Sequence, residues 1–276
     1  MSLFITSLNS GSNGNCYYIG NKKEAILVDC GISCREVEKR MLRLQLDIKI
    51  VKAVFISHEH SDHIKGIEVF CKKYQIPVYC TSVTAQHCGF SINFSYLNYF
   101  TNGDLVTIGE LEIQSFCKKH DANDPCSFCI SYNGIKVGVF TDLGVACNNV
   151  VHHFSQCHAA FLEANYDSEM LAAGVYPWHL KKRISGGLGH LSNDEALMLF
   201  TNHRSHFLTH LILSHLSKNN NCPEKLAQIF SPYCKELNII VASRNNETAL
   251  FEIGAKKLFA EKEIRPIYVQ AQFSFV

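Results

Sequence analysis

The chain has 276 residues, of which 47% are hydrophobic and 18% are charged. This balance is typical of folded globular proteins and excludes an intrinsically disordered chain, and the length allows a large core. The net charge of +1 excludes a strongly basic molecule that would attract nucleic acid over its whole surface. A polyanion would therefore have to be held by local groups or by bound metal ions.

The sequence carries no recognisable export or membrane signal. The N-terminal stretch MSLFITSLNSGSNG lacks the basic region and long apolar run of a signal peptide, and no window approaches the ~20 apolar residues that span a membrane. The 13 cysteines are scattered along the chain and odd in number, which favours reduced thiols in a cytoplasm. The single Cys-x-x-Cys pair, Cys126 and Cys129, lacks a second pair, so we expect it to be structural.

The first 50 residues predict three strands followed by a helix. The strands are expected at Leu3–Leu8, Cys16–Ile19 and Ala25–Val28. The loop SLNSGSNGN joins the first two strands, and we expect it to be structural, with a place at the mouth of a pocket as the alternative. Ser33 and Glu36 have the spacing of a capping box, which predicts that a helix begins there.

The most informative segment is VKAVFISHEHSDHIKG, residues 51–66. Its apolar first half is typical of a buried strand, which we expect to stop at Ser57. Four residues of metal-ligand type follow within six positions: His58, His60, Asp62 and His63. The first two are alternate residues and can turn the same way, whereas the other two begin a helix that carries Ile64, Ile67 and Phe70 inward. This arrangement could serve two metal ions.

Downstream, the expected elements alternate between strands and helices. Asn133–Gly134 between two apolar runs is typical of a type I′ hairpin. The expected strands are Ile76–Cys80, Leu105–Ile108, Leu111–Phe116, Ser127–Tyr132, Lys136–Phe140, Ala159–Glu163, Leu208–Leu213, Leu237–Ala242 and Thr248–Ile253. The expected helices are Asn148–Gln156, a helix that begins at a capping box of Ser192 and Glu195, and Pro223–Phe230. This order predicts two packed sheets with helices outside, in one domain over residues 1–255, with an extension of unassigned structure at 256–276.

Three more potential ligands lie just past the ends of predicted strands: His120, Asp142 and His215. Each alone would more often be a structural residue, but a packed-sheet fold gathers such strand ends at one edge, beside the four-ligand loop. A carboxylate at the position of Asp142 could bridge two ions. Imidazole and carboxylate donors together suit Zn or Mn, and also Fe or Ni, so the pattern predicts a metal site without fixing the metal.

With these residues in place, the chain resembles the metallo-β-lactamase superfamily over nearly its whole length up to about Ile253. The strings SGSNGNCYYI, HEHSDHIKG, KKHDANDPCSF, FTDLG, LEANYD, YPWHLKKRI, GHLSNDEA and LSHLSKNNN resemble, within it, the YycJ/WalJ-type bacterial proteins. The resemblance implies an α/β fold of αββα four-layer sandwich type and a metal-dependent 5′→3′ DNA exonuclease. It also implies His58, His60 and His120 on one metal, Asp62, His63 and His215 on the other, and Asp142 between them.

His190 is the candidate for contact with a phosphate. It lies two residues before the Ser192 cap, in the Gly-rich turn SGGLGH, and a helix N-terminus favours anions. A histidine there could hold a phosphate oxygen or protonate a leaving oxygen, and the alternative is a polar residue that completes the turn. The basic run 181–183 is either a contact to the DNA backbone or a solvated helix face. Glu163 either orients a ligand imidazole or is an ordinary acid at a strand end.

These observations predict a cytoplasmic hydrolase with two divalent metal ions that cleaves DNA, with RNA left open as a substrate. Asp62, Asp142 and His190 are the expected catalytic residues, and a hydroxide between the metals is the expected nucleophile. The alternative is a small-molecule hydrolase acting on a thioester, a lactone or a cyclic phosphodiester, because the same metals polarise a carbonyl equally well. A third interpretation, a non-enzymatic scaffold, is disfavoured by the complete ligand set. The sequence does not indicate the oligomeric state.

Overall fold

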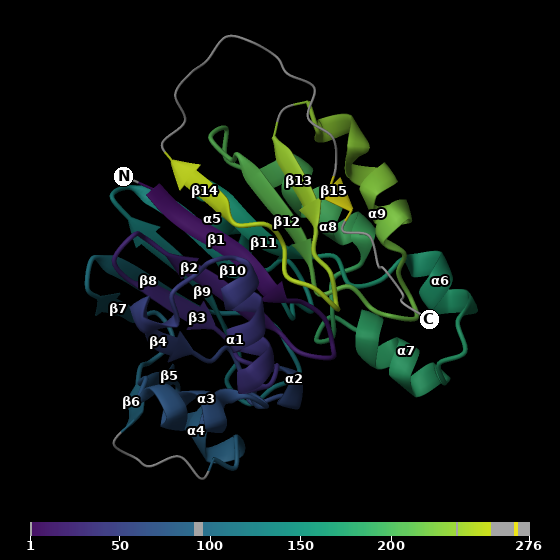
Figure 1. The fold of residues 1–276 in the computed structure, drawn as a ribbon. Helices are drawn as coiled ribbons and strands as arrows, with labels where there is room; N and C mark the ends of the chain where they lie inside the picture. Colours follow the sequence, from purple (N-terminus) through teal and green to yellow (C-terminus); the bar gives the residue numbers. More distant parts are fainter. Residues whose placement is uncertain (1, 91–95, 236, 255–267, 270–276) are drawn as a thin grey trace.

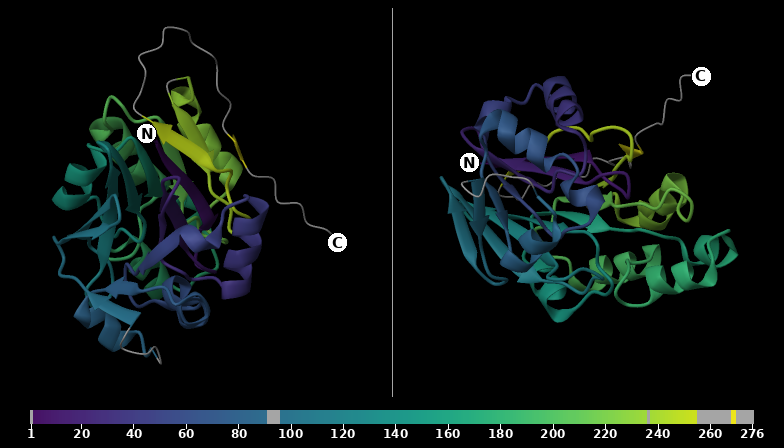
Figure 2. Two further views of the ribbon diagram at one scale, coloured as in Figure 1. Left: turned by 60° about the vertical axis from the view of Figure 1, so that its left-hand side comes forward. Right: turned by 90° about the horizontal axis from the view of Figure 1, so that it is seen from below.

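The computed structural model describes residues 2–90, 96–235, 237–254 and 268–269. The strands of this part form a seven-stranded and an eight-stranded sheet that pack face to face, and helices cover both outer faces (Figures 1 and 2). This is the predicted αββα arrangement. Among the described residues, no helix combines the length and apolar character needed to cross a membrane.

The first sheet contains the N-terminal strands, and a strand from late in the chain, at residues 251–254, forms one of its edges. Its order is β14-β1-β2-β3-β4-β5-β6. The strands are β1 (Ser2–Asn9), β2 (Cys16–Gly20), β3 (Ala25–Val28), β4 (Val51–Phe55), β5 (Val78–Cys80), β6 (Leu97–Tyr99) and β14 (Phe251–Gly254). Since β14 pairs with β1 in antiparallel fashion, segments about 250 residues apart in the sequence lie side by side in this sheet.

The second sheet has the order β15-β13-β12-β11-β10-β9-β8-β7. Its strands are β7 (Leu105–Ile108), β8 (Leu111–Cys117), β9 (Cys126–Tyr132), β10 (Ile135–Phe140), β11 (Ala159–Glu163), β12 (His210–Ser214), β13 (Asn238–Val241) and β15 (Tyr268–Val269). The predicted hairpin between β9 and β10 is confirmed, since Asn133 and Gly134 both have positive φ, at 49° and 78°.

Nine helices are described. They are α1 (Cys34–Arg43), α2 (Ser61–Ile64), α3 (Ile67–Tyr74), α4 (Ser82–His87), α5 (Asn148–Phe154), α6 (Ser168–Ala173), α7 (Trp178–Ser185), α8 (Asn193–His203) and α9 (Pro223–Phe230). Helices α1 and α3 pack on the outer face of the first sheet, and α5, α8 and α9 pack on the outer face of the second. Helix α7 has no buried residue and lies at the side of the molecule with α6 (Figure 1).

The core between the sheets is aromatic and aliphatic. Tyr17 of the first sheet contacts Phe161 of the second, with ring centroids 4.9 Å apart. Phe55 and Phe128 make a similar contact across the layers at 5.6 Å, in an edge-to-face arrangement. Such buried aromatic contacts contribute about 1 kcal/mol each beyond the area that they bury. They fix how the two sheets sit on one another.

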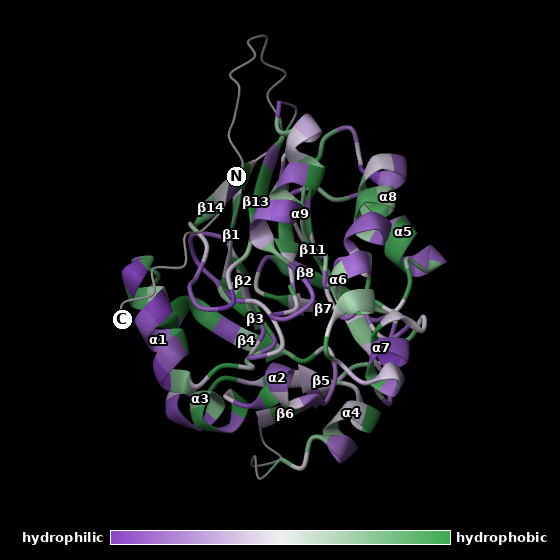
Figure 3. Ribbon diagram, turned by 90° about the vertical axis from the view of Figure 1, so that its right-hand side faces the viewer, coloured by the Kyte–Doolittle hydropathy of each residue, from purple (hydrophilic) through white to green (hydrophobic). Residues whose placement is uncertain are grey.

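The strand directions bring the site residues together. Strands β3 and β4 are parallel, and so are β10, β11, β12 and β13. Parallel strands end at the same edge of their sheet, where ligand sites in α/β folds form. Ser57, Asp142 and His215 follow the ends of β4, β10 and β12, respectively, and therefore lie at one edge of the sandwich. Figure 3 shows α2, α6 and α7 around the loops at this edge.

Several points of the sequence prediction need correction. The helix of the metal motif is broken into α2 and α3, because the Gly66 N–H donates to the Cys30 carbonyl at 2.8 Å instead of to the Asp62 carbonyl, which accepts from the Asn15 N–H at 2.7 Å. The first capping box is half formed: Ser33 accepts from the backbone N–H of Glu36, but the Glu36 carboxylate pairs with Arg40 instead. Two helices, α6 and α7, were not assigned bounds. The strand predicted at Leu208–Leu213 is His210–Ser214, and the closing strand is Phe251–Gly254.

The prediction of one domain over residues 1–255 stays a prediction. Most of the predicted extension, apart from Tyr268–Val269, lies outside the described residues, as do residues 91–95 of the segment between Thr81 and Tyr99.

The tightest backbone contact at the site edge joins Gly31 to the metal motif. Its N–H donates to the Asn15 carbonyl, and an added Cβ would lie 1.6 Å from the Asp62 carbonyl oxygen. We expect Gly31→Ala to lower the free energy of unfolding by about 3 kcal/mol, because the backbone of the motif must move. Urea unfolding measures the loss. Gly89→Ala is the control: Gly89 has a φ of 61° but open space around it, so only a left-handed backbone cost of about 1 kcal/mol is expected. Equal losses in the two variants would contradict the steric explanation.

Candidate metal centre

The structure brings all seven predicted ligands together at the edge where the parallel strands end. Three imidazoles form the first group. The Nε2 of His58 lies 3.0 Å from the Nδ1 of His60, and the Nε2 of His120 lies 3.4 Å from that same Nδ1. These three nitrogens face one another, and they match the group that the resemblance implies for one metal.

A second group lies beside the first. The Nε2 of His63 and the Nε2 of His215 are each 3.6 Å from one carboxylate oxygen of Asp62. Asp142 lies between the groups: its oxygens are 3.1 Å from His63, 3.6 Å from His215 and 3.8 Å from His120. The geometry therefore allows the implied partition, with Asp142 in reach of both groups, but His58 also converges with His63 and Asp142, so the assignment of ligands to two ions stays a prediction.

Hydrogen bonds on the far side of the rings decide which ring nitrogen carries the proton. The Nδ1 of His63 lies 2.7 Å from a carboxylate oxygen of Asp29, which can only accept, so that nitrogen carries the hydrogen. The Ser57 hydroxyl donates to the same carboxylate and must then accept from the Nδ1 of His58, 2.9 Å away. Both rings thus turn an Nε2 lone pair toward the site.

The same logic holds on the side of the second sheet. His120 donates from Nδ1 to the Gly189 carbonyl at 3.0 Å. Glu163 accepts from the Nδ1 of His215 at 2.9 Å and from the Nδ1 of His190 at 2.8 Å. Its other oxygen accepts backbone N–H groups of Leu143 and Leu191, which hold the carboxylate in place. Glu163 therefore orients two imidazoles, as one of the two sequence interpretations has it.

These donors fit a metal ion. The Nε2 atoms of four rings meet in a small space together with two carboxylates, an arrangement that needs either protons or a metal cation between them. The Oδ2 of Asp142 and the Nε2 of His215 are buried and have no hydrogen bond among the described residues. Buried polar atoms normally have a hydrogen-bond partner or bind an ion, so these two atoms indicate that a group binds at the centre of the site. Nitrogen and oxygen donors of this kind suit Zn or Mn.

The acid–base properties divide the rings into two pairs. Burial lowers the pKa of His58 well below its ordinary value and that of His120 to about 4, so both stay neutral. Burial also acts to lower the pKa of His63 and His215, but the charge of Asp142 and the other carboxylates around these rings together outweigh it. The pKa of His63 is raised well above its ordinary value and that of His215 is raised to about 10. In metal-free protein these two rings hold the protons that a metal would replace.

Several residues that shape the site were not predicted. Asp29, Ser57 and Asn15 position the metal motif, and the Nδ2 of Asn15 lies 3.3 Å from Asp62 and 3.1 Å from His63. The loop SLNSGSNGN therefore borders the site, which was the alternative interpretation. Asn165, which lies in the string LEANYD, donates to the His215 carbonyl at 2.7 Å. The only sequence signal for Asp29 is its position directly after a buried strand.

His190 and the basic run lie at the rim. His190 is partly exposed, with 22% of its side chain accessible, and its Nδ1 is 3.7 Å from Asp142. In the basic run, Arg183 pairs with Asp121, the neighbour of His120, and Lys181 donates to the Ala172 carbonyl. Two of the three basic residues thus have partners within the protein, which weakens the prediction that the run binds DNA phosphates.

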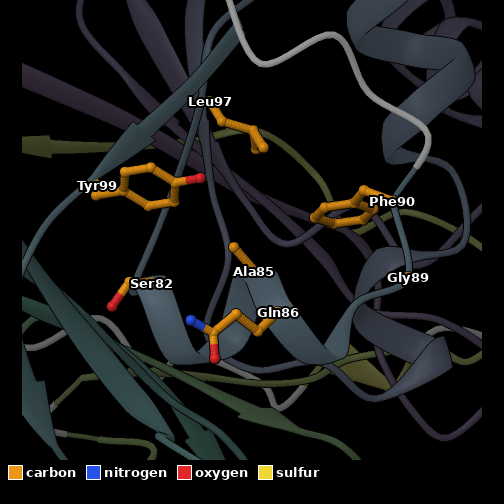
Figure 4. Close-up of a pocket in the computed structure, with 7 residues that line it drawn as sticks. All are labelled: Ser82, Ala85, Gln86, Gly89, Phe90, Leu97 and Tyr99. Carbon is orange, nitrogen blue, oxygen red and sulfur yellow. The ribbon is translucent and has the colours of Figure 1, made fainter.

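A separate pocket lies away from the metal centre, beside α4. It has a volume of about 510 Å³ and is lined by residues of α4 and β6, with the rings of Phe90 and Tyr99 on its two sides (Figure 4). It contains none of the predicted ligands.

Cys126 and Cys129 are buried free thiols, in agreement with a structural role, and all 13 cysteines are free.

Comparison with known proteins decides the family. Residues 10–174 match the model of the metallo-β-lactamase superfamily. The chain belongs to this superfamily. Within it, the chain is 35% identical over 227 residues to exodeoxyribonuclease YycJ of Bacillus anthracis, covering 81% of this chain and 86% of that protein. It is 32% identical over 222 residues to exodeoxyribonuclease WalJ of Streptococcus pneumoniae, covering 79% and 82%. The predicted resemblance is confirmed.

Solved structures of the superfamily share the fold. The metallo-β-lactamase fold protein YhfI of Bacillus subtilis matches with a TM-score of 0.70 and 15% identity, over 91% of this chain and all of that one. A diphosphatase of the PhnP family matches with a TM-score of 0.63 and 14% identity, over 92% and 98%. At these identities the likeness concerns the fold alone, and it confirms the predicted four-layer sandwich.

Metal binding should release protons. A pH of 7 lies below the raised pKa values of His63 and His215, so both rings are protonated in metal-free protein. An imidazole that binds a metal must be neutral. We expect Zn²⁺ added to chelator-treated protein at pH 7 to release about two protons, measured by calorimetry in buffers of different ionisation enthalpy. The release should decrease toward the His215 pKa of about 10, where that proton is already lost. His215→Asn should remove about one proton from the release. Binding without proton release would contradict this assignment.

Proposed function

We propose that the protein is an exodeoxyribonuclease that uses two divalent metal ions and removes nucleotides from the 5′ ends of DNA. The observation that carries this proposal is the complete set of seven converging donors with His190 at its rim. The exodeoxyribonuclease relatives, which align over about four fifths of this chain, support DNA as the substrate. Reduced thiols, in line with the 13 free cysteines, support a place in the cytoplasm.

In this proposal the metals are Zn or Mn. His58, His60 and His120 would hold one ion, Asp62, His63 and His215 the other, and Asp142 would contact both. Two such ions supply positive charge to a phosphodiester and make a nucleophile available from water at neutral pH. The residues around the ions keep the rings neutral, oriented and shielded, since five of the seven ligands are nearly fully buried.

His190 is suited to act on the substrate. Its Nδ1–H bonds to Glu163, so its Nε2 is left to hold a phosphate oxygen or to give a proton to the departing oxygen. Although burial opposes ionisation of Glu163, the charge of His190 and the hydrogen bonds of His190 and His215 lower its pKa to about 2. The ionised Glu163 carboxylate accepts from the Nδ1–H of His190 and so fixes the orientation of its ring. The partial exposure of His190 gives a substrate access to it.

The first experiment uses duplex and single-stranded DNA labelled at the 5′ or the 3′ end, with Mn²⁺ or Zn²⁺ supplied. We expect stepwise loss of nucleotides from the 5′ end, and a loss of at least about 1,000-fold in rate for His60→Ala and Asp62→Ala with weakened metal retention. Gel analysis of products and metal analysis by mass spectrometry provide the measurements. Full activity in either variant would contradict the site. Hydrolysis of a thioester, lactone or cyclic phosphodiester without cleavage of DNA would support the small-molecule alternative.

A separate variant tests the role of His190. His190→Ala should keep the metal content of the wild type while the rate of DNA cleavage falls about 100-fold or more, because a proton donor is lost and no metal ligand is. His87→Ala, at an exposed position on α4, is the matched control and should behave like the wild type. Loss of metal from His190→Ala would instead make His190 a ligand.

A further inference from the structure

Arg244 follows β13 and lies against the side of the metal centre that holds Asp62, His63 and His215. Its Nη1 donates to the carbonyl of Leu216, the residue after His215, at 2.9 Å. Its own carbonyl accepts from the Nδ2 of Asn13 at 2.7 Å. The guanidinium is therefore tied to the loop after β12, and the backbone of Arg244 to the loop after β1.

Both loops position the centre. In the first, the Ser10 hydroxyl accepts the backbone N–H of His215 at 2.7 Å, and Asn15 contacts the motif. Between these residues, Gly11 leaves room for the arginine: an added Cβ would lie 3.0 Å from the Nη1 of Arg244. In the second loop, Leu216 directly follows the predicted ligand. The guanidinium thus lies across the two loops that frame one half of the centre.

The charge of Arg244 is not balanced within the described part of the chain. Arg43 pairs with Glu247 and Arg183 pairs with Asp121, but Arg244 has no carboxylate within ion-pair distance there. Partial burial lowers the pKa of Arg244, and the groups that act against this are Tyr176 and Asp62. The other guanidinium nitrogens make no hydrogen bond and are not sealed from solvent among the described residues. A half-buried, fixed guanidinium with free N–H groups is a receptor for an anion.

We propose that Arg244 binds a non-bridging oxygen of a phosphate that flanks the scissile one in a DNA strand. This inference rests on the proposed function, because it requires a substrate with at least two phosphates. The planar fork of arginine matches a phosphate and can donate two parallel hydrogen bonds. The net charge of the chain is only +1, so such a local cation is the means by which this protein would hold a polyanion.

The test compares DNA with bis(p-nitrophenyl) phosphate, a phosphodiester that has no flanking phosphate. In the metal-loaded protein, Arg244→Gln should lower kcat/KM for a 5′-phosphorylated single strand at least about tenfold more than it lowers kcat/KM for the small ester. Arg244→Lys should lose less, since a point charge replaces the fork. Lys22→Gln, which removes an exposed charge in the β2–β3 turn, is the matched control and should match the wild type on both substrates.

Binding provides a readout that does not depend on turnover. In the slow His190→Ala background, fluorescence anisotropy of a labelled single strand should show at least about tenfold weaker binding when Arg244→Gln is added. The slope of log affinity against log salt should become shallower by about 0.7. The metal content should equal that of the background variant, which separates loss of a phosphate contact from collapse of the centre.

The outcomes separate the two proposals. DNA cleavage and DNA affinity in Arg244→Gln equal to those in Lys22→Gln would overturn the role of Arg244 and leave the exonuclease proposal standing. Equal losses on DNA and on the small ester would also overturn it, because the variant would then damage the centre itself. Hydrolysis of the small ester by wild-type protein that neither binds nor cleaves DNA would overturn the proposed function, and the role of Arg244 with it.

Discussion

The arrangement of this site depends on one constraint: several buried imidazoles must turn unprotonated nitrogens toward the same space. A ring does so only if its other nitrogen has an acceptor at the right place. Asp29, Ser57, Gly189 and Glu163 supply these acceptors from different strand ends and loops. The two sheets must therefore pack in one register for the acceptors and rings to meet, and the aromatic contacts between the sheets maintain that register.

The backbone at the strand ends is shaped for the same purpose. Asp29, Asp142 and His215 follow β3, β10 and β12, and all three have positive φ values between 56° and 61° although none is glycine. Such a conformation costs about 1 kcal/mol or more per residue, so the surrounding structure must stabilise it. At each position the left-handed turn ends the strand; it directs Asp142 and His215 into the centre and Asp29 onto the outer nitrogen of His63. Strain concentrated at a site in this way is typical of functional residues.

The sequence was sufficient to find the seven side chains that converge at the centre, whose role as ligands stays a prediction, and insufficient to find the residues that hold them. His58, His60, Asp62 and His63 are neighbours in a distinctive string, and His120, Asp142 and His215 each end an apolar run. Ser57 and Asp29 have no such pattern, because their role depends on the parallel pairing of β3 with β4 and on the direction of a hydroxyl hydrogen. Arg244 is likewise defined by loops more than 200 residues apart in the chain. The break between α2 and α3 also follows from a distant contact, the hydrogen bond from the Gly66 N–H to the Cys30 carbonyl.

The carboxylate of Asp29 serves both halves of the centre. It accepts directly from His63 and, through the Ser57 hydroxyl, it fixes the ring of His58. These two rings belong to the groups proposed for different ions, so the polarisation of one ring is transmitted to the other along a chain of two hydrogen bonds. Coupling of this kind is reciprocal. In the proposed two-metal centre, the two ion positions would therefore be thermodynamically linked, and their occupancy would be a shared property of the pair rather than the product of two independent affinities.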